Sequence, residues 1–172
     1  TKLHALLTNV EFLVPIDLHF FQEIAKLRSL SILTHTLLHT LDHHQKEDIS
    51  IHAINSWRYD STFDPWNNLV RTSIQGLAAF IAGVNYVTLT PSLSTPNMTK
   101  RSLCDYYFTC GKVLQKETHI QQYLDPGQGS GYIDSLTNQL TQQSWQQFQK
   151  IEELGGWNTF QKRGFLKDQQ QQ

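Results

Sequence analysis

The chain has 172 residues, the size of one domain, with 39% apolar residues, 17% charged residues and a net charge of −1 at pH 7. This balance describes an ordinary globular protein and indicates no nucleic-acid partner, since such proteins carry basic patches. The longest apolar runs, such as Leu77 to Val84, fall well short of the roughly 20 residues that cross a bilayer, so we expect no membrane partner and a cytoplasmic location.

The first half of the chain alternates between strand-like and helix-like segments. A short apolar run at Val10–Val14, followed by a proline, predicts a strand, and apolar residues at three- and four-residue steps predict a long helix from about Asp17 to Leu41. The alternating segment Ile49–Ile54 predicts a second strand.

The second half continues the alternation. Asp64-Pro65 is a typical helix start, and Gly83 is the expected stop. The buried face of this helix is predicted to contain Trp66, Leu69, Val70, Ile74, Leu77, Ala78 and Ile81. Tyr86–Leu89, which is rich in β-branched and aromatic residues, predicts the third strand.

Two more helices are predicted beyond the third strand. One follows Pro96-Asn97, and the other follows the glycine-rich segment from Asp125 to Gly131 and stops at Gly155-Gly156. We interpret the glycine-rich segment as a sharp turn, because it follows a helix and no lysine comes after it, which excludes the phosphate-binding loop context.

A strand-helix alternation builds a parallel sheet with helices outside it. Three strands do not close a (β/α)₈ barrel, which takes about 250 residues. We therefore predict an α/β fold that is the second half of such a TIM-type barrel, with about three parallel strands and long flanking helices. Residues 1–166 are assigned to this partial domain, and the glutamine-rich tail 167–172 is expected to be disordered.

Three segments resemble the barrel domain of the methylmalonyl-CoA mutase family. Pro15 to Arg28 is similar to the family pattern FF-x-EIAK-x-R, Asp64 to Thr72 to DP-x-NN-x-x-RT, and Asp125 to Thr137 to DP-x-x-GS-Y-x-x-x-LT. They occur in family order and with family-like separations. The resemblance covers the chain from about Leu7 to Gly156 and corresponds to the C-terminal half of the barrel.

The resemblance implies a cobalamin-dependent isomerase that interconverts methylmalonyl-CoA and succinyl-CoA by radical chemistry. In this family adenosylcobalamin is held by a separate domain of the catalytic subunit, through a D-x-H-x-x-G motif that this sequence lacks. The catalytic tyrosine-histidine pair belongs to an earlier barrel strand. We therefore assign no catalytic residue, no bound cofactor and no metal ligand to this chain.

The matching segments also depart from the catalytic pattern. Ile54 stands where catalytic chains have a glutamine that faces the adenosyl group, and the loop from Pro91 to Pro96 contains none of the carboxylates of the family's DEA-x-x-LP loop. The chain thus resembles the non-catalytic small subunit of heterodimeric mutases, whose partner is a catalytic chain. The alternatives are a fragment of a catalytic chain that binds acyl-CoA, or a diverged α/β protein with another binding role.

Three residues occupy family positions associated with the acyl-CoA substrate. Arg28 lies where the family places a cation near the CoA phosphates, although a solvated helix arginine is an equal interpretation. His52, at a strand end, could form a hydrogen bond with acyl-CoA, or be a structural histidine within the barrel mouth. Asn85 replaces a family glutamine.

Other polar residues are interpreted as structural. His35, His39 and His43 share a helical face but lack a further ligand at a matching step, so we interpret them as solvated. Arg71 is predicted to anchor structure, for example by pairing with a carboxylate.

The two cysteines are also interpreted as structural. Cys104 and Cys110 lie six apart on one predicted helix, about 9 Å from each other at 1.5 Å rise per residue, which is too far for a disulfide. Both are predicted to be buried packing residues.

Overall fold

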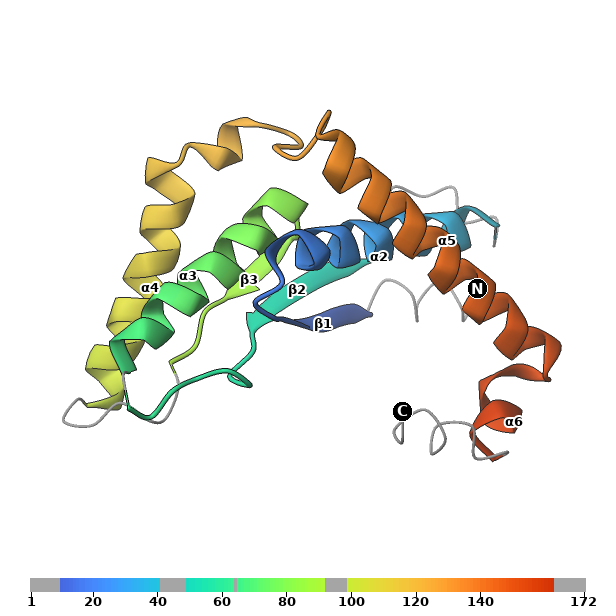
Figure 1. Ribbon diagram of the computed structural model, residues 1–172, viewed down its shortest axis with the longest axis horizontal. Coiled ribbons are helices and arrows are strands. Elements are labelled where there is room, and N and C mark those ends of the chain that lie inside the picture. The colour runs from blue at the N-terminus through green and yellow to red at the C-terminus, as the bar shows by residue number, and fades with distance from the viewer. Residues whose placement is uncertain (1–9, 41–48, 64, 92–98, 163–172) are drawn as a thin grey trace.

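The computed structural model describes residues 10–40, 49–63, 65–91 and 99–162, which form an α/β structure. Its three parallel strands are β1 (Glu11–Ile16), β2 (Ser50–Asn55) and β3 (Tyr86–Thr88), in the order β1-β2-β3. They are followed in turn by helices α2 (Phe20–Thr40), α3 (Pro65–Ala82) and α4 (Lys100–Glu117) (Figure 1). The parallel sheet and its flanking helices confirm the predicted α/β fold with three parallel strands, and this arrangement is consistent with part of a (β/α) barrel.

The first strand continues past the proline that was expected to follow it. Pro15 lies inside β1, where its main-chain oxygen accepts a hydrogen bond of 2.7 Å from Lys26 Nζ. Ser56 N donates to Ile16 O, and main-chain groups alternate in direction along a strand, so the position of Pro15 faces the outer edge. A proline is tolerated there because that edge requires no N–H donor.

The two faces of the sheet are covered very differently. In the register of β1 and β2, Val14 pairs with Ala53, and both pack with α2 and α3 in the hydrophobic core together with Ile16 and Ile51. The opposite face carries Leu13, which is 61% exposed. We call this opposite side the open face; its strand residues are Glu11, Leu13, Pro15, Ser50, His52, Ile54, Tyr86 and Thr88.

Helix α3 buries a different face from the one predicted. Ala78 is buried as expected, but Trp66, Val70 and Ile74 are between 41% and 58% exposed. The ring of Trp66 lies edge-on to that of Tyr106 on α4, 6.1 Å between centroids, so the apolar stripe faces α4 and solvent. The residues that point inward are largely polar: Asn68, Thr72, Gln75 and Ala79.

Polar groups are tolerated inside because several of them bind neighbouring main chain. Asn68 is fully buried, accepts from Ser61 N and donates to Ser61 O, both at 2.9 Å. Gln75 Nε2 donates to Ser56 O at 3.2 Å. These bonds fix the segment that connects β2 to α3, which is why polar side chains occupy the inner face.

The helix boundaries otherwise agree with the sequence signals. Pro65 is the first residue of α3, and Gly83, with φ +74°, ends it. Asp64, Leu41 and the Pro96-Asn97 pair lie outside the described residues, as does the tail 167–172. Thr99 caps α4 by accepting a hydrogen bond from Ser102 N.

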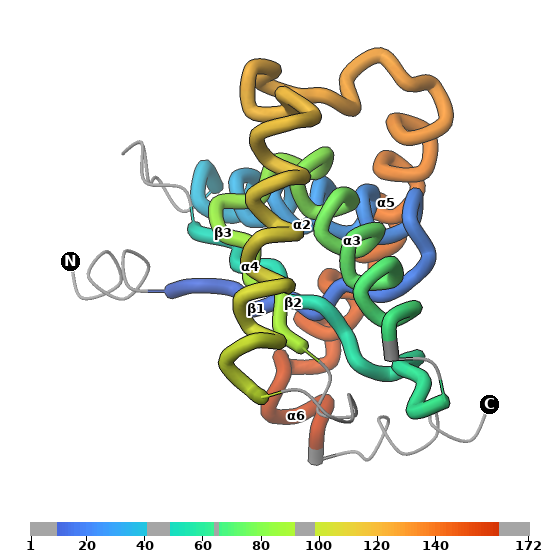
Figure 2. Tube along the Cα trace, turned by 90° about the vertical axis from the view of Figure 1, so that its left-hand side faces the viewer, coloured from blue at the N-terminus to red at the C-terminus, as the bar shows by residue number. Residues whose placement is uncertain are grey.

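A connection that includes the short 3-10 helix η1 (Ile120–Gln122) leads from α4 to α5 (Gly131–Glu153), passing over the top of the molecule in Figure 2. Gly129 has φ +81°, which confirms the sharp turn. The beginning of α5 packs on α2, and the helix then extends away from the sheet. Two glycines of positive φ end it, and a further helix, α6 (Gly156–Lys162), follows, which was not predicted.

Candidate functional site

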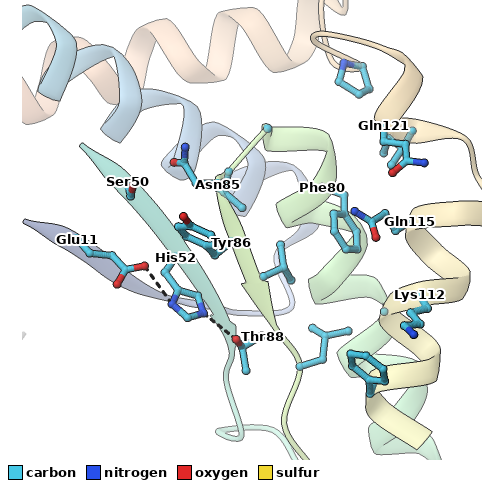
Figure 3. Close-up of a pocket in the computed structure, with 18 of the residues that line it drawn as sticks. Glu11, Ser50, His52, Phe80, Asn85, Tyr86, Thr88, Lys112, Gln115 and Gln121 are labelled. Atoms are coloured by element: carbon cyan, nitrogen blue, oxygen red, sulfur yellow. Dashed lines mark hydrogen bonds and ion pairs between the residues drawn. The ribbon is translucent and has the colours of Figure 1, made fainter. Parts of the chain in front are cut away.

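A cavity of about 1110 Å³ lies beside the third strand, between the amino-terminal part of the sheet, α4 and η1. Its strand side contains open-face residues together with Val87 from the core side of β3, and its helix side comes from α3, α4 and η1 (Figure 3). Lining residues that carry polar groups include Glu11, Ser50, His52, Asn85, Thr88, Lys112 and Gln115. Two of the three residues predicted to contact substrate, His52 and Asn85, therefore lie in one cavity.

His52 has a polar neighbour on each side, one at hydrogen-bond and one at ion-pair distance. It is the third residue of β2 rather than the end of the strand, so its ring projects from the middle of the open face. Its Nδ1 lies 3.3 Å from Glu11 Oε1 on β1, and its Nε2 lies 2.7 Å from Thr88 Oγ1 on β3 (Figure 3). The ring also contacts Tyr86 edge-on, 5.9 Å between centroids. One residue from each strand therefore joins a single chain of polar contacts.

Asn85 lies at the amino-terminal end of β3 and is exposed. Its side-chain oxygen accepts from Ile51 N at 2.9 Å, and its own main-chain N–H donates to Ile51 O at 3.1 Å. The side-chain amide nitrogen is the part left to contact a ligand.

Arg28 lies in another part of the molecule and joins α2 to the start of α5. Its guanidinium donates to Asp125 Oδ1 at 2.6 Å and to Asp134 Oδ1 at 3.4 Å. Gly127 lies directly against this group: a Cβ added there would be 2.7 Å from Arg28 Nη1. We call Arg28, Asp125 and Asp134 the arginine clamp. Two carboxylates already neutralise the cation that was considered for CoA phosphates.

The predictions for the residues interpreted as structural are confirmed only in part. Arg71 anchors structure as expected, but through the amide oxygen of Asn68, at 2.8 Å, rather than a carboxylate. Cys104 is exposed, which corrects the prediction that it is buried, whereas Cys110 is half-buried with its Sγ 3.0 Å from Ser73 Oγ. Cys104 lies on the exposed side of α4, so the presence of a cysteine at this position does not indicate that the residue is buried in the core.

The histidine face of α2 ends outside the described part of the chain. His35 and His39 are exposed, and His43 is not among the described residues. Within residues 10–40, 49–63, 65–91 and 99–162, no three histidine, cysteine or acidic side chains are grouped so that they could hold a metal ion. No helix in the same ranges is long and apolar enough to cross a membrane.

Sequence reasoning missed Glu11 and Thr88. The predicted strand segments contain very few ionisable side chains, and Glu11 and His52 are two of them. That scarcity was the available signal, because a charged residue within an apolar strand needs a partner. The register that places Glu11, His52 and Thr88 side by side is a non-local property that the individual segments do not contain.

Comparison with known proteins gives a consistent result. A family model described as methylmalonyl-CoA mutase matches residues 2–172. The methylmalonyl-CoA mutase small subunit of Porphyromonas gingivalis is 30% identical over 157 residues, which cover 87% of this chain and 25% of that protein. The small subunit of Propionibacterium freudenreichii subsp. shermanii is 34% identical over 105 residues, covering 60% of this chain and 16% of that protein.

A methylmalonyl-CoA mutase of Rhizobium meliloti is 29% identical over 156 residues, covering 86% of this chain and 21% of that protein. The chain thus spans about a quarter or less of the length of these relatives. Because the family model covers nearly the whole chain, the chain belongs to the methylmalonyl-CoA mutase family.

Proposed function

We propose that this chain is part of a methylmalonyl-CoA mutase subunit of the small, non-catalytic kind, which packs against a catalytic chain and supports it in the cytoplasm. Adenosylcobalamin on the catalytic chain would supply the radical chemistry that interconverts methylmalonyl-CoA and succinyl-CoA. We propose no cobalamin site on this chain, because its sequence has no D-x-H-x-x-G motif.

The main support for this proposal is that one face and both outer edges of the sheet are left uncovered by the described residues. In the described part of the chain, β1 and β3 each pair with β2 alone, so two edges have no neighbouring strand. On the open face Leu13 is 61% exposed and Tyr86 is 57% exposed. Parallel sheets occur almost only with both faces covered. We therefore expect further barrel segments and a partner chain to cover this surface.

The open face would then form part of a wall of an acyl-CoA cavity. We propose His52 and Asn85 as the residues that face the ligand, because both line the cavity. Arg28 is better explained as a residue that holds α5 on α2, because its guanidinium is already bound by Asp125 and Asp134.

The alternative proposal is a piece of a catalytic chain that contributes part of the acyl-CoA-binding barrel. Ile54 favours the non-catalytic reading: it lies on the open face, half-buried, and its hydrocarbon side chain makes no hydrogen bond where catalytic chains have a glutamine. The loop 92–98, which contains the other departure from the catalytic pattern, lies outside the described residues.

Co-expression with a catalytic methylmalonyl-CoA mutase chain tests the assembly. We expect the two chains to co-elute in size-exclusion chromatography, and the variant Leu13→Glu on the open face to prevent it by placing a charge in the interface. Ile32→Glu is the matched control, since Ile32 is 43% exposed on α2, away from the open face. Recovery as a folded monomer that does not bind the catalytic chain would favour a diverged protein with another binding role. Mutase activity gained by adding only an upstream barrel half and a cobalamin domain would support the catalytic-fragment alternative.

A further inference from the structure

We propose that the outer surface of α3 and α4 docks on the catalytic mutase chain through an apolar stripe. We call this surface the outer stripe; its residues are Trp66, Val70 and Ile74 on α3 and Tyr106 and Val113 on α4, each between 41% and 58% exposed. The inference rests on the proposed role of the chain as a supporting subunit. It adds a contact surface on the helical side of the sheet, away from the open face.

Helix α3 has its polar and apolar faces reversed relative to an ordinary surface helix. Asn68, Thr72 and Gln75 are at most 2% exposed, whereas the outer-stripe residues of the same helix are about half exposed. Residues at three- and four-residue steps share one face of a helix, so each set forms a continuous face. A surface helix normally turns its apolar face to the core and its polar face to water. Contact with another protein explains the reversal.

The charge content of α3 indicates which kind of partner fits. Arg71 is the only charged residue among its 18 residues, and the guanidinium donates to Asn68 Oδ1 at 2.8 Å. Helix α4 has the same length and six charged residues. Exposed helix faces normally carry charged side chains, and anionic membranes attract clusters of lysine and arginine. Because α3 offers neither, an uncharged protein surface is the partner that matches it.

The outer stripe is continuous across the two helices. The rings of Trp66 and Tyr106 meet edge-on, and farther along the helices Ser73 Oγ lies 3.0 Å from Cys110 Sγ. At about half exposure, the five side chains of the stripe present roughly 400 Å² of apolar surface. One partner contributes about 450 Å² of apolar area to an interface of standard size. The stripe is therefore large enough to form the apolar part of one such interface.

Further segments of a barrel would not cover the outer stripe. Helix α3 packs against α2 on one side and α4 on the other (Figure 1). Additional strands join the sheet beside β1 and β3, so the helices that follow them lie beyond α2 and α4 rather than over α3. The cover must therefore come from outside the barrel, which is where a partner chain packs.

The variant Ile74→Glu tests the inference by titration calorimetry with a catalytic methylmalonyl-CoA mutase chain. An unpaired charge in the apolar contact should weaken binding roughly 30-fold or more. Ile32→Glu is the matched control, because Ile32 on α2 is 43% exposed and Ile74 is 41% exposed, and it should bind like the unmodified chain. Trp66→Ala removes an aromatic side chain without adding charge and should weaken binding roughly tenfold.

Two further measurements separate docking from folding. Ile74→Glu and Ile32→Glu should unfold at similar urea concentrations, because both side chains are exposed in the free chain. In Val113→Cys the introduced thiol should lose most of its reactivity toward a thiol reagent when the catalytic chain is bound. The thiol introduced by Ile32→Cys should react at the same rate in the free chain and in the complex.

Several results would overturn the inference. Ile74→Glu might bind as tightly as Ile32→Glu, or the thiol of Val113→Cys might keep its reactivity in the complex. Ile74→Glu could instead convert a dimer of this chain into monomers without affecting the catalytic chain, and the stripe would then be a contact between two copies. Sedimentation with vesicles of equal parts phosphatidylserine and phosphatidylcholine that Ile74→Glu abolishes would assign the stripe to a lipid surface.

The open-face variant Leu13→Glu keeps this inference distinct from the subunit proposal. If Leu13→Glu prevents co-elution and Ile74→Glu does not, the subunit proposal stands and the outer-stripe inference is wrong. If the unmodified chain does not bind the catalytic chain at all, both are wrong.

Discussion

The arginine clamp predicts that a single methyl group at Gly127 destabilises the fold. In Gly127→Ala the new Cβ would lie 2.7 Å from Arg28 Nη1, the atom that donates to Asp125 Oδ1 at 2.6 Å. No real Cβ contact is that short, so the guanidinium must withdraw from the loop and weaken its bond to Asp125. The guanidinium is the end of a flexible side chain and can move, but moving it weakens its bond to Asp125 and its longer contact of 3.4 Å with Asp134.

The expected cost follows from the burial of the clamp. A hydrogen bond to a charged group contributes about 1.5–3 kcal/mol, but exposed ion pairs contribute only about 0–1 kcal/mol. The side chains of Arg28, Asp125 and Asp134 are 17%, 35% and 42% exposed, so the clamp is partly buried and its energy should lie between these two values. We therefore expect a loss of about 1–2 kcal/mol, partly offset by about 0.4–1 kcal/mol that Gly→Ala gains by restricting the unfolded chain.

Urea denaturation against Gly131→Ala isolates the clamp. Gly131 is the first residue of α5, and an added Cβ there meets nothing within 4 Å, so this variant should be neutral or slightly stabilising. Both variants share the unfolded-state gain, and their difference of about 1–2 kcal/mol reports the clamp. In an Arg28→Met background the same Gly127→Ala change should cost little. Equal stability of the two alanine variants, or an unchanged cost without Arg28, would refute the reasoning.

Three further predictions concern side chains whose surroundings were not anticipated. The side chain of Asn55, which is 3% exposed, forms hydrogen bonds with the main-chain N–H, the main-chain carbonyl and the hydroxyl of Thr90. Asn55→Ala should therefore lower the free energy of unfolding by about 2–3 kcal/mol in urea titration. The exposed Asn138→Ala should change it by less than about 0.5 kcal/mol, and similar values for both would contradict the role of Asn55. Asn68→Ala should cost about 1–3 kcal/mol, because it leaves the main chain of Ser61 without two bonds; circular dichroism during urea unfolding measures it, and a midpoint equal to that of the unmodified chain would argue against it. Cys104 should react with a thiol reagent faster than Cys110, because Cys104 is exposed and Cys110 is half-buried; mass spectrometry of the partly labelled chain shows the order, and preferential labelling of Cys110 would reverse our assignment.

The strands and helices could be predicted because their signals are local. β-branched residues marked β2 and β3, and three- and four-residue apolar spacing marked α2. The apolar stripe of α3 predicted the wrong buried face. Trp66 packs toward α4, and Asn68 is buried because it forms hydrogen bonds with the loop that precedes its helix. Apolar spacing finds a helix but does not decide which neighbour its apolar face meets.

The candidate site was predicted only in part. Family position indicated His52, and the cavity contains it, but Glu11 and Thr88 are brought to it by the pairing of strands that lie far apart in the sequence. Arg28 was selected for its chemistry, and its partners Asp125 and Asp134 are about a hundred residues away. Contacts between distant segments are set by tertiary packing, which short patterns do not encode.

The proline inside β1 has a consequence for how the sheet can grow. At the outer edge Pro15 offers no N–H, and its oxygen is already occupied by Lys26 Nζ, so an added strand finds no main-chain partner there. Pairing of two molecules edge to edge is hindered at this end of β1, and a strand that belongs to the complete fold can pair only nearer to Glu11 and Leu13. Pro15 thus restricts both self-aggregation and the alignment of whichever strand comes next.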